Sequence, residues 1–181
     1  MTGAGSAGES CGPWDLPSFQ PSKAQHRDQF MTTVRIEILP PWEESGLADL
    51  QTLLQGQPGR PADWADHLLE DLRHRKDAKY AFFVRAGDEQ GRMLGGALVA
   101  DLRHPGDRES RPWLCALWVH PDFRSRGLGR KLAQMADQAV RERGAFELLV
   151  RVHPDDDSAL FMAERWGYFR EEVLMSKSLT L

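Results

Sequence analysis

The residues with the clearest capacity for chemistry form a basic, glycine-containing stretch, RSRGLG, at positions 124–129. An apolar run, Trp113 to Val119, precedes this stretch and predicts a buried strand. Apolar residues at helical spacing follow it and predict a helix over 130–143. In this order of elements the unpaired N–H groups at the start of the helix point outward, and the helix dipole favours an anion there. The stretch therefore predicts a pyrophosphate-binding loop.

The residue types within the loop agree with this interpretation. Gly127 and Gly129 place no Cβ between the backbone and a phosphate oxygen. The arginines of the loop and Lys131 would add charge-assisted hydrogen bonds. Without a ligand, the same residues would form an ordinary helix start, which is the structural alternative.

Two other phosphate-binding motifs fit the stretch poorly. A Walker A loop continues with Gly-Lys-Ser/Thr, whereas Gly129 is followed by Arg130 and Lys131, so no hydroxyl is present to hold magnesium. A dinucleotide fingerprint needs glycine or alanine at the position of Leu132 and an acidic residue about 20 positions later. A nucleotide-binding protein is therefore the weaker alternative, and we expect no metal.

The loop instead resembles the Arg/Gln-x-x-Gly-x-Gly/Ala signature of the GNAT superfamily of acyl-CoA N-acyltransferases, and Leu117 to Phe123 resembles the strand and loop before that signature. The resemblance covers roughly residues 31–181. It implies an α/β (α+β) fold with a mixed, mostly antiparallel central sheet, helices on both faces, and acetyl-CoA as co-substrate between two diverging parallel strands. The residues expected to bind the cofactor are Leu117, Trp118, Val119, Arg124, Ser125, Arg126, Gly127, Leu128, Gly129 and Arg130.

The periodicity of the rest of the chain predicts the elements that position this loop. Strands are expected at 34–39, 80–85, 92–102, 113–119, 146–152 and 172–179, and helices at 43–55, 62–74, 130–143 and 158–165. Asp155, Asp156 and Asp157 are N-cap candidates for the last helix, which Gly167 ends. The strand–helix–strand order predicts that 113–119 and 146–152 pair in parallel.

Composition favours a single folded domain. The chain has 181 residues, of which 41% are hydrophobic and 28% charged, with a net charge of −4. This charge does not favour nucleic acid or an anionic membrane as a partner. The sequence shows neither an apolar run long enough to span a membrane nor a signal peptide at its N-terminus. Its two cysteines, Cys11 and Cys115, fit a reducing cytoplasm.

Residues 1–30 differ from the rest of the chain. They are rich in glycine, proline and serine and lack an apolar period, which predicts a disordered tail ahead of a domain at 31–181. Translation could equally start at Met1 or at Met31, and Trp14 and Phe19 could instead dock on a partner subunit. Whether the chain forms a homodimer is left open.

The residues that would move protons are harder to assign. The resemblance implies a glutamate in the strand before the loop and a tyrosine in the last helix, but the corresponding positions hold Cys115 and Ala163. His120, beside the expected cleft, is the remaining catalytic candidate, because histidine titrates near neutrality. The alternatives are that His120 is a solvated loop residue and that bound water carries the proton. Further candidates of lower standing are Asp101, His104, Glu164 and Tyr168. The alternative for Asp101 and His104 is a role in turns, and the resemblance implies that Tyr168 packs as the aromatic residue after the last helix.

The expected activity is transfer of an acetyl group from acetyl-CoA to a primary amine, on a small molecule, a lysine or a protein N-terminus, by direct reaction in a ternary complex. Trp118 near the acetyl end could attract a cationic amine, although core packing is the more usual role of a tryptophan. The loss of the usual glutamate and tyrosine leaves a second class open, a non-catalytic acyl-CoA-binding sensor or interaction module.

Overall fold

The structure is a computed structural model that describes residues 33–57, 63–103, 109–153 and 155–170. The chain divides into two units, Met1–Met31 and Thr32–Leu181, and all of the described residues belong to the second. The predicted tail at 1–30 and the predicted strand at 172–179 lie outside the described residues. Both therefore stay predictions.

The described part of the second unit contains a five-stranded sheet with the strands in sequence order. The strands are β1 (Arg35–Leu39), β2 (Phe82–Gly87), β3 (Met93–Leu102), β4 (Arg111–Val119) and β5 (Leu149–Val150). The first three pairings are antiparallel and the last, between β4 and β5, is parallel. The prediction of a mixed, mostly antiparallel sheet is confirmed.

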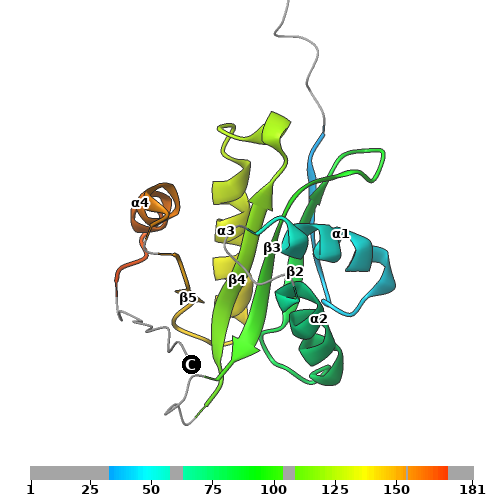
Figure 1. The fold of residues 1–181 in the computed structure, drawn as a ribbon, viewed down its shortest axis with the longest axis vertical. Coiled ribbons are helices and arrows are strands. Elements are labelled where there is room, and N and C mark those ends of the chain that lie inside the picture. The colour runs from blue at the N-terminus through cyan, green and yellow to red at the C-terminus, as the bar shows by residue number, and fades with distance from the viewer. Residues whose placement is uncertain (1–32, 58–62, 104–108, 154, 171–181) are drawn as a thin grey trace, which may run out of the picture. The chain divides into compact units, whose positions relative to one another are not determined.

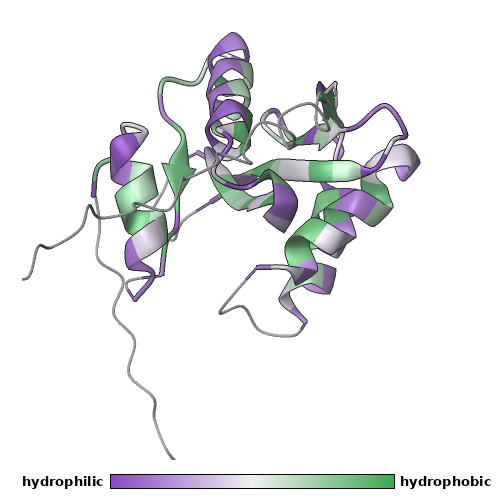
Figure 2. Ribbon diagram, turned by 90° about the horizontal axis from the view of Figure 1, so that it is seen from above, coloured by the Kyte–Doolittle hydropathy of each residue, from purple (hydrophilic) through white to green (hydrophobic). Residues whose placement is uncertain are grey.

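Helices cover both faces of this sheet (Figure 1). The helices are α1 (Glu44–Gln55), α2 (Trp64–His74), α3 (Leu128–Glu142) and α4 (Asp157–Arg165), with a short 3-10 turn, η1, at Pro121–Phe123. Leucines of α1 and α2 pack with Phe83 and Leu98 on one face of the sheet. On the other face, Leu132 and its neighbours on α3 pack with Phe82 and Val99. Figure 2 shows the matching pattern, in which the helices alternate hydrophobic and hydrophilic residues along their length.

Most predicted elements are found within two residues of their expected bounds, because their apolar residues follow a clear period. The N-cap of α4 is Asp156, whose carboxylate accepts the Ala159 N–H at 2.9 Å, and Gly167 follows the helix with φ +97°. The strand predicted at 146–152 is shorter than expected, since only Leu149–Val150 pairs with β4. Phe146, which made that run look longer, is fully exposed.

Candidate functional site

β4 and β5 diverge shortly after they begin to pair. Trp113 lies opposite Leu149 and Leu114 opposite Val150, and no later residue of β4 pairs with β5. On its other edge, β4 remains paired with β3 as far as Val119. The edge of β4 that faces β5 is therefore open from Cys115 to Val119, within the part of the chain that the structure describes.

A β-bulge marks the point of divergence. The register between β3 and β4 shifts there, since Val99 lies opposite Leu114 and Leu98 opposite Ala116, which leaves Cys115 as the extra residue. A bulge bends its strand and increases its twist, which accounts for the separation of β4 from β5. The half-buried thiol of Cys115 donates a hydrogen bond to the Trp113 carbonyl, with an Sγ–O distance of 3.4 Å.

The open edge presents backbone N–H groups to the gap. The His120 N–H donates to the Leu94 carbonyl at 2.8 Å, so it points toward β3. Because N–H directions alternate along a strand, the Leu117 and Val119 N–H groups point the opposite way, into the gap. Fixed donors of this kind can stabilise negative charge on a carbonyl oxygen.

The basic loop joins this edge to α3 through two residues with positive φ. Ser125 has φ +57° and Gly127 has φ +82°. Gly127 is also the N-cap of α3 and provides no side-chain cap. The Lys131 N–H makes the first hydrogen bond of the helix, to the Gly127 carbonyl at 3.0 Å. Among the described residues, no hydrogen-bond acceptor is found for the N–H groups of residues 128–130, so the first turn of α3 has the arrangement of an anion site.

The helix begins two residues earlier than the sequence predicted, at Leu128. The two glycines of the loop consequently differ in role. Gly127 needs its positive φ, whereas Gly129 is helical, and a Cβ on it would make ordinary contacts with Val119 and Trp166 at 3.5 and 3.7 Å. Only Gly127 is therefore required by the backbone conformation of the loop.

Of the four basic residues at 124–131, Arg124 and Arg126 lie in the loop, and Arg130 and Lys131 lie in the first turn of α3. The Arg124 Nε donates to the Val119 carbonyl at 3.1 Å and so ties the loop to the open end of β4. The Arg126 guanidinium lies 5.5 Å from the centre of the Phe123 ring. Arg130 and Lys131 form no salt bridge with any residue that the structure describes. Their charges strengthen the attraction of an anion to the first turn of α3.

His120 lies directly after the open edge but is held as a cap. Its Nδ1 accepts the Asp122 N–H at 3.3 Å, at the start of η1. Its ring packs edge-on against Trp118 and Phe123, with centroid distances of 5.9 and 6.1 Å, and the side chain is one-third exposed. These contacts leave Nε2 as the ring nitrogen for any proton transfer.

The remaining candidate residues have other partners. The Tyr168 hydroxyl donates to Asp137 Oδ1 on α3 at 3.4 Å. Burial and the Asp137 charge raise the pKa of Tyr168, and burial also raises the pKa of Asp137, against the effect of Arg141. Tyr168 thus anchors the end of α4 as a neutral phenol.

Two acidic candidates also have structural roles. Asp101 is buried on β3, where its Oδ2 accepts the Tyr80 N–H at 3.1 Å. Glu164 pairs with Arg170, with a nitrogen–oxygen distance of 3.0 Å. His104 lies outside the described residues.

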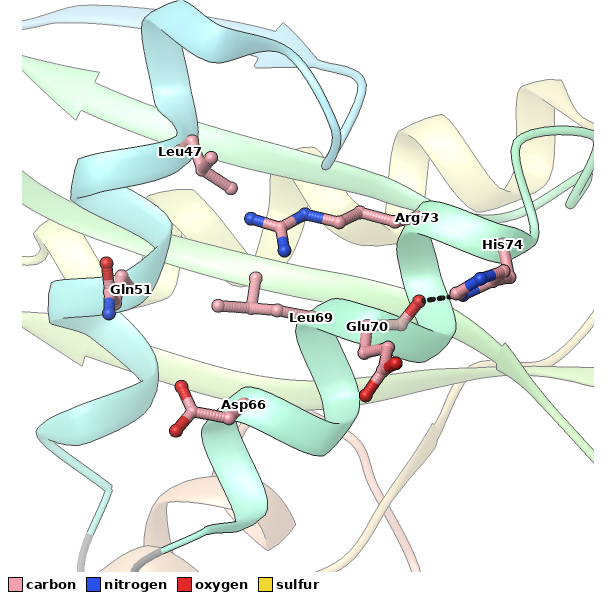
Figure 3. A pocket seen from close by; sticks show the side chains of 7 residues that line it. All are labelled: Leu47, Gln51, Asp66, Leu69, Glu70, Arg73 and His74. Atoms are coloured by element: carbon pink, nitrogen blue, oxygen red, sulfur yellow. Dashed lines mark hydrogen bonds between the residues drawn. The ribbon is translucent and has the colours of Figure 1, made fainter.

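Two cavities accompany these elements. The larger, of about 470 Å³, lies between α1 and α2, and all of its described lining residues belong to these helices (Figure 3). The smaller, of about 150 Å³, adjoins the point where β4 and β5 diverge, and sequence reasoning missed it because its lining comes from four separate segments. Its lining residues are Trp64, Leu68, Leu102, Trp113, Leu114, Cys115 and Arg151.

The described residues contain no group of three or more His, Cys, Asp or Glu side chains placed to hold a metal ion. No helix among them is both long enough and apolar enough to cross a membrane.

Comparisons with known proteins agree with this geometry. The acetyltransferase (GNAT) family profile matches residues 47–168. An uncharacterized N-acetyltransferase of Bacillus subtilis (strain 168), YdgE, is 27% identical over 105 residues, which cover 58% of this chain and 65% of that protein. The chain therefore spans somewhat less than two thirds of the length of this curated relative.

Solved structures show the same fold. The aminoglycoside N-acetyltransferase AAC(6')-Iy in complex with CoA superposes with a TM-score of 0.63 at 19% identity, covering 83% of this chain and 97% of that one. The aminoglycoside acetyltransferase meta-AAC0020, from an uncultured soil metagenomic sample and in complex with sisomicin, gives a TM-score of 0.60 at 22% identity, covering 82% and 96%. Because the family profile matches well over half of the chain, the protein belongs to the acetyltransferase (GNAT) family.

Proposed function

We propose that the chain is an acetyl-CoA-dependent N-acetyltransferase that acts on a primary amine. The proposal rests on one observation: the open edge of β4 is joined, through η1 and the basic loop, to the uncapped N-terminus of α3. A long ligand with a pyrophosphate in its middle could bind at both places, with its phosphates at 126–130 and its thioester arm along Leu117 to Val119. A relative bound to CoA supports this assignment.

The residues of the chain would then act on the reaction as follows. Acetyl-CoA supplies an activated thioester. A C–N bond forms between its acetyl carbon and the amine as its C–S bond breaks. The Leu117 N–H, which points into the gap, would stabilise the negative charge on the thioester oxygen. The amine gives up a proton and the departing thiolate takes one, so the site needs a path for protons.

We expect water, rather than His120, to provide that path. Since Nδ1 of His120 is used to cap η1, we expect His120→Ala to lower kcat less than about fivefold and to leave the pH–rate profile unchanged. Steady-state kinetics at several pH values would check this. A loss of about 100-fold, with a flattened acidic limb and unchanged acetyl-CoA affinity, would instead make His120 the proton carrier.

The proposal is tested by binding and turnover measured separately. We expect acetyl-CoA, but not ATP or NAD, to raise the melting temperature, because a ligand that binds only the folded state stabilises it. We also expect free CoA thiol to appear when acetyl-CoA is supplied with a panel of amines. Stabilisation without CoA release from any amine would favour the second candidate, a non-catalytic acyl-CoA sensor, which the alanine at position 163 and the cysteine at 115 keep open.

We also propose that residues 117–119 and 124–130 bind the cofactor, that the protein is cytoplasmic, and that a tail at 1–30 precedes a domain at 31–181. The neighbours named as aminoglycoside acetyltransferases suggest a multiply charged amine as one acceptor to include in the panel.

A further inference from the structure

The smaller cavity lies where an acceptor would meet the proposed thioester. Cys115 directly follows Leu114, the last residue of β4 that pairs with β5, and Arg151 directly follows Val150, the last paired residue of β5. Both line the cavity, so it opens at the fork between the two strands. Its opposite wall comes from α2, on the face of the sheet away from α3.

The size and lining of the cavity select a compact apolar group. About 150 Å³ is the space that a benzene ring or a branched alkyl group fills. Trp64, Leu68, Leu102 and Trp113 provide apolar and aromatic surface. A sugar ring placed there would bury hydroxyl groups against carbon, which is unfavourable without hydrogen-bond partners.

The charge at the cavity selects an anion. Arg151 is the one charged residue among the described residues that line it, and no carboxylate is found in that lining. Its guanidinium lies 5.5 Å from the centre of the Trp113 ring and forms no salt bridge with the part of the chain that is described. A planar guanidinium is suited to a carboxylate, whereas a second ammonium group at this place would be repelled.

We propose that the acceptor is a small amine whose apolar or aromatic substituent enters this cavity and whose carboxylate pairs with Arg151. A free amino acid with a large hydrophobic side chain is the simplest member of this class. This inference rests on the proposed N-acetyltransferase function. The amine nitrogen then bonds to the acetyl carbon as the C–S bond breaks. The acceptor, an ammonium group in solution, loses two protons: one goes to solvent and the other to the departing thiolate, so that CoA leaves as the thiol.

The test compares matched acceptors. CoA release is measured with phenylalanine and leucine, with their amides, which lack the carboxylate, with glycine, which lacks the apolar group, and with an aminoglycoside. We expect kcat/KM for the two amino acids to exceed that for the amides and glycine at least tenfold. We expect the aminoglycoside to be a poorer acceptor still.

Variants then assign the preference to the cavity. We expect Arg151→Glu to lower kcat/KM for phenylalanine at least tenfold, so that phenylalanine amide becomes the better acceptor of the two. Acetyl-CoA affinity should stay unchanged. Leu68→Trp, which fills the cavity, should lower kcat/KM for phenylalanine more than for glycine. The control is Arg73→Met, because Arg73 lies on α2 in the lining of the larger cavity. This variant should change kcat/KM for neither phenylalanine nor glycine.

The outcomes separate this inference from the proposed function. Acetyl-CoA binding with faster turnover of the aminoglycoside or of the amides, or an Arg151→Glu variant that matches the parent, would overturn the acceptor class and leave the N-acetyltransferase function intact. Absence of both acetyl-CoA stabilisation and CoA release would overturn the function itself.

Discussion

Gly127→Asp is expected to lower acetyl-CoA affinity about 100-fold, or ~2.7 kcal/mol, while the protein stays folded. Aspartate tolerates the left-handed conformation that Gly127 adopts at φ +82°, and a Cβ there would meet no atom of the described protein within 4 Å. The new carboxylate would occupy the N-terminus of α3 and repel the pyrophosphate from the N–H groups that should bind it. Calorimetric titration with acetyl-CoA measures the change, and circular dichroism confirms the fold.

Two control variants isolate the electrostatic cause. Gly127→Asn has nearly the same shape without the charge and should lose no more than about tenfold in affinity. Gly129→Ala should bind within about threefold of the parent, because a Cβ on Gly129 makes only ordinary contacts with Val119 and Trp166. A folded Gly127→Asp variant that binds acetyl-CoA normally would show that the cofactor does not bind at this helix start.

The sequence predicted the order of strand, loop and helix because that signal is local. The positive φ of Gly127 and the start of α3 depend on residues that adjoin one another in the chain. The order strand–loop–helix–strand also determines the parallel pairing of β4 and β5. Features of this kind need no knowledge of distant contacts.

The fork between the strands could be predicted only in outline. The resemblance implied that the two parallel strands diverge, but the bulge at Cys115 depends on which residues of β3 lie opposite β4, a non-local register. The short length of β5 has the same origin, since an apolar run does not reveal where pairing stops. The cavity was missed because α2, β3, β4 and the residue after β5 each contribute part of it.

The candidate side chains show a further limit of sequence reasoning. Residue type made His120 a suitable proton carrier, whereas Tyr168 was expected to pack after the last helix, but the sequence did not show the partner of either residue. His120 caps η1 through Nδ1, and Tyr168 is held by Asp137. Neither partner follows from a periodic pattern, because each depends on the exact path of the chain around the site.

Gly95→Ala is expected to lower both stability and activity, because Gly95 lies on β3 opposite Val119, at the open end of β4. A Cβ there would lie 2.9 Å from the Trp118 carbonyl oxygen and 3.1 Å from Leu132, a fully buried residue of α3. Since the carbonyl belongs to the backbone, relief of the clash must shift the segment whose N–H groups face the gap. We expect the free energy of unfolding to fall by about 1–3 kcal/mol, and kcat/KM to fall about tenfold, or ~1.4 kcal/mol.

Gly96→Ala separates these two effects. A Cβ on Gly96 would lie 2.6 Å from the Phe83 ring, in the core beneath α1, and 3.3 Å from the Val84 carbonyl oxygen on β2. It would strain the packing there without pressing on the Trp118 carbonyl. Chemical denaturation should show a comparable loss of stability in both variants, whereas kcat/KM for Gly96→Ala should stay within about threefold of the parent. If both variants lose activity in proportion to stability, the position of the open β4 edge does not control the reaction. If Gly95→Ala alone loses activity, the close approach of β3 to β4 at this glycine is what positions the Leu117 N–H toward the thioester.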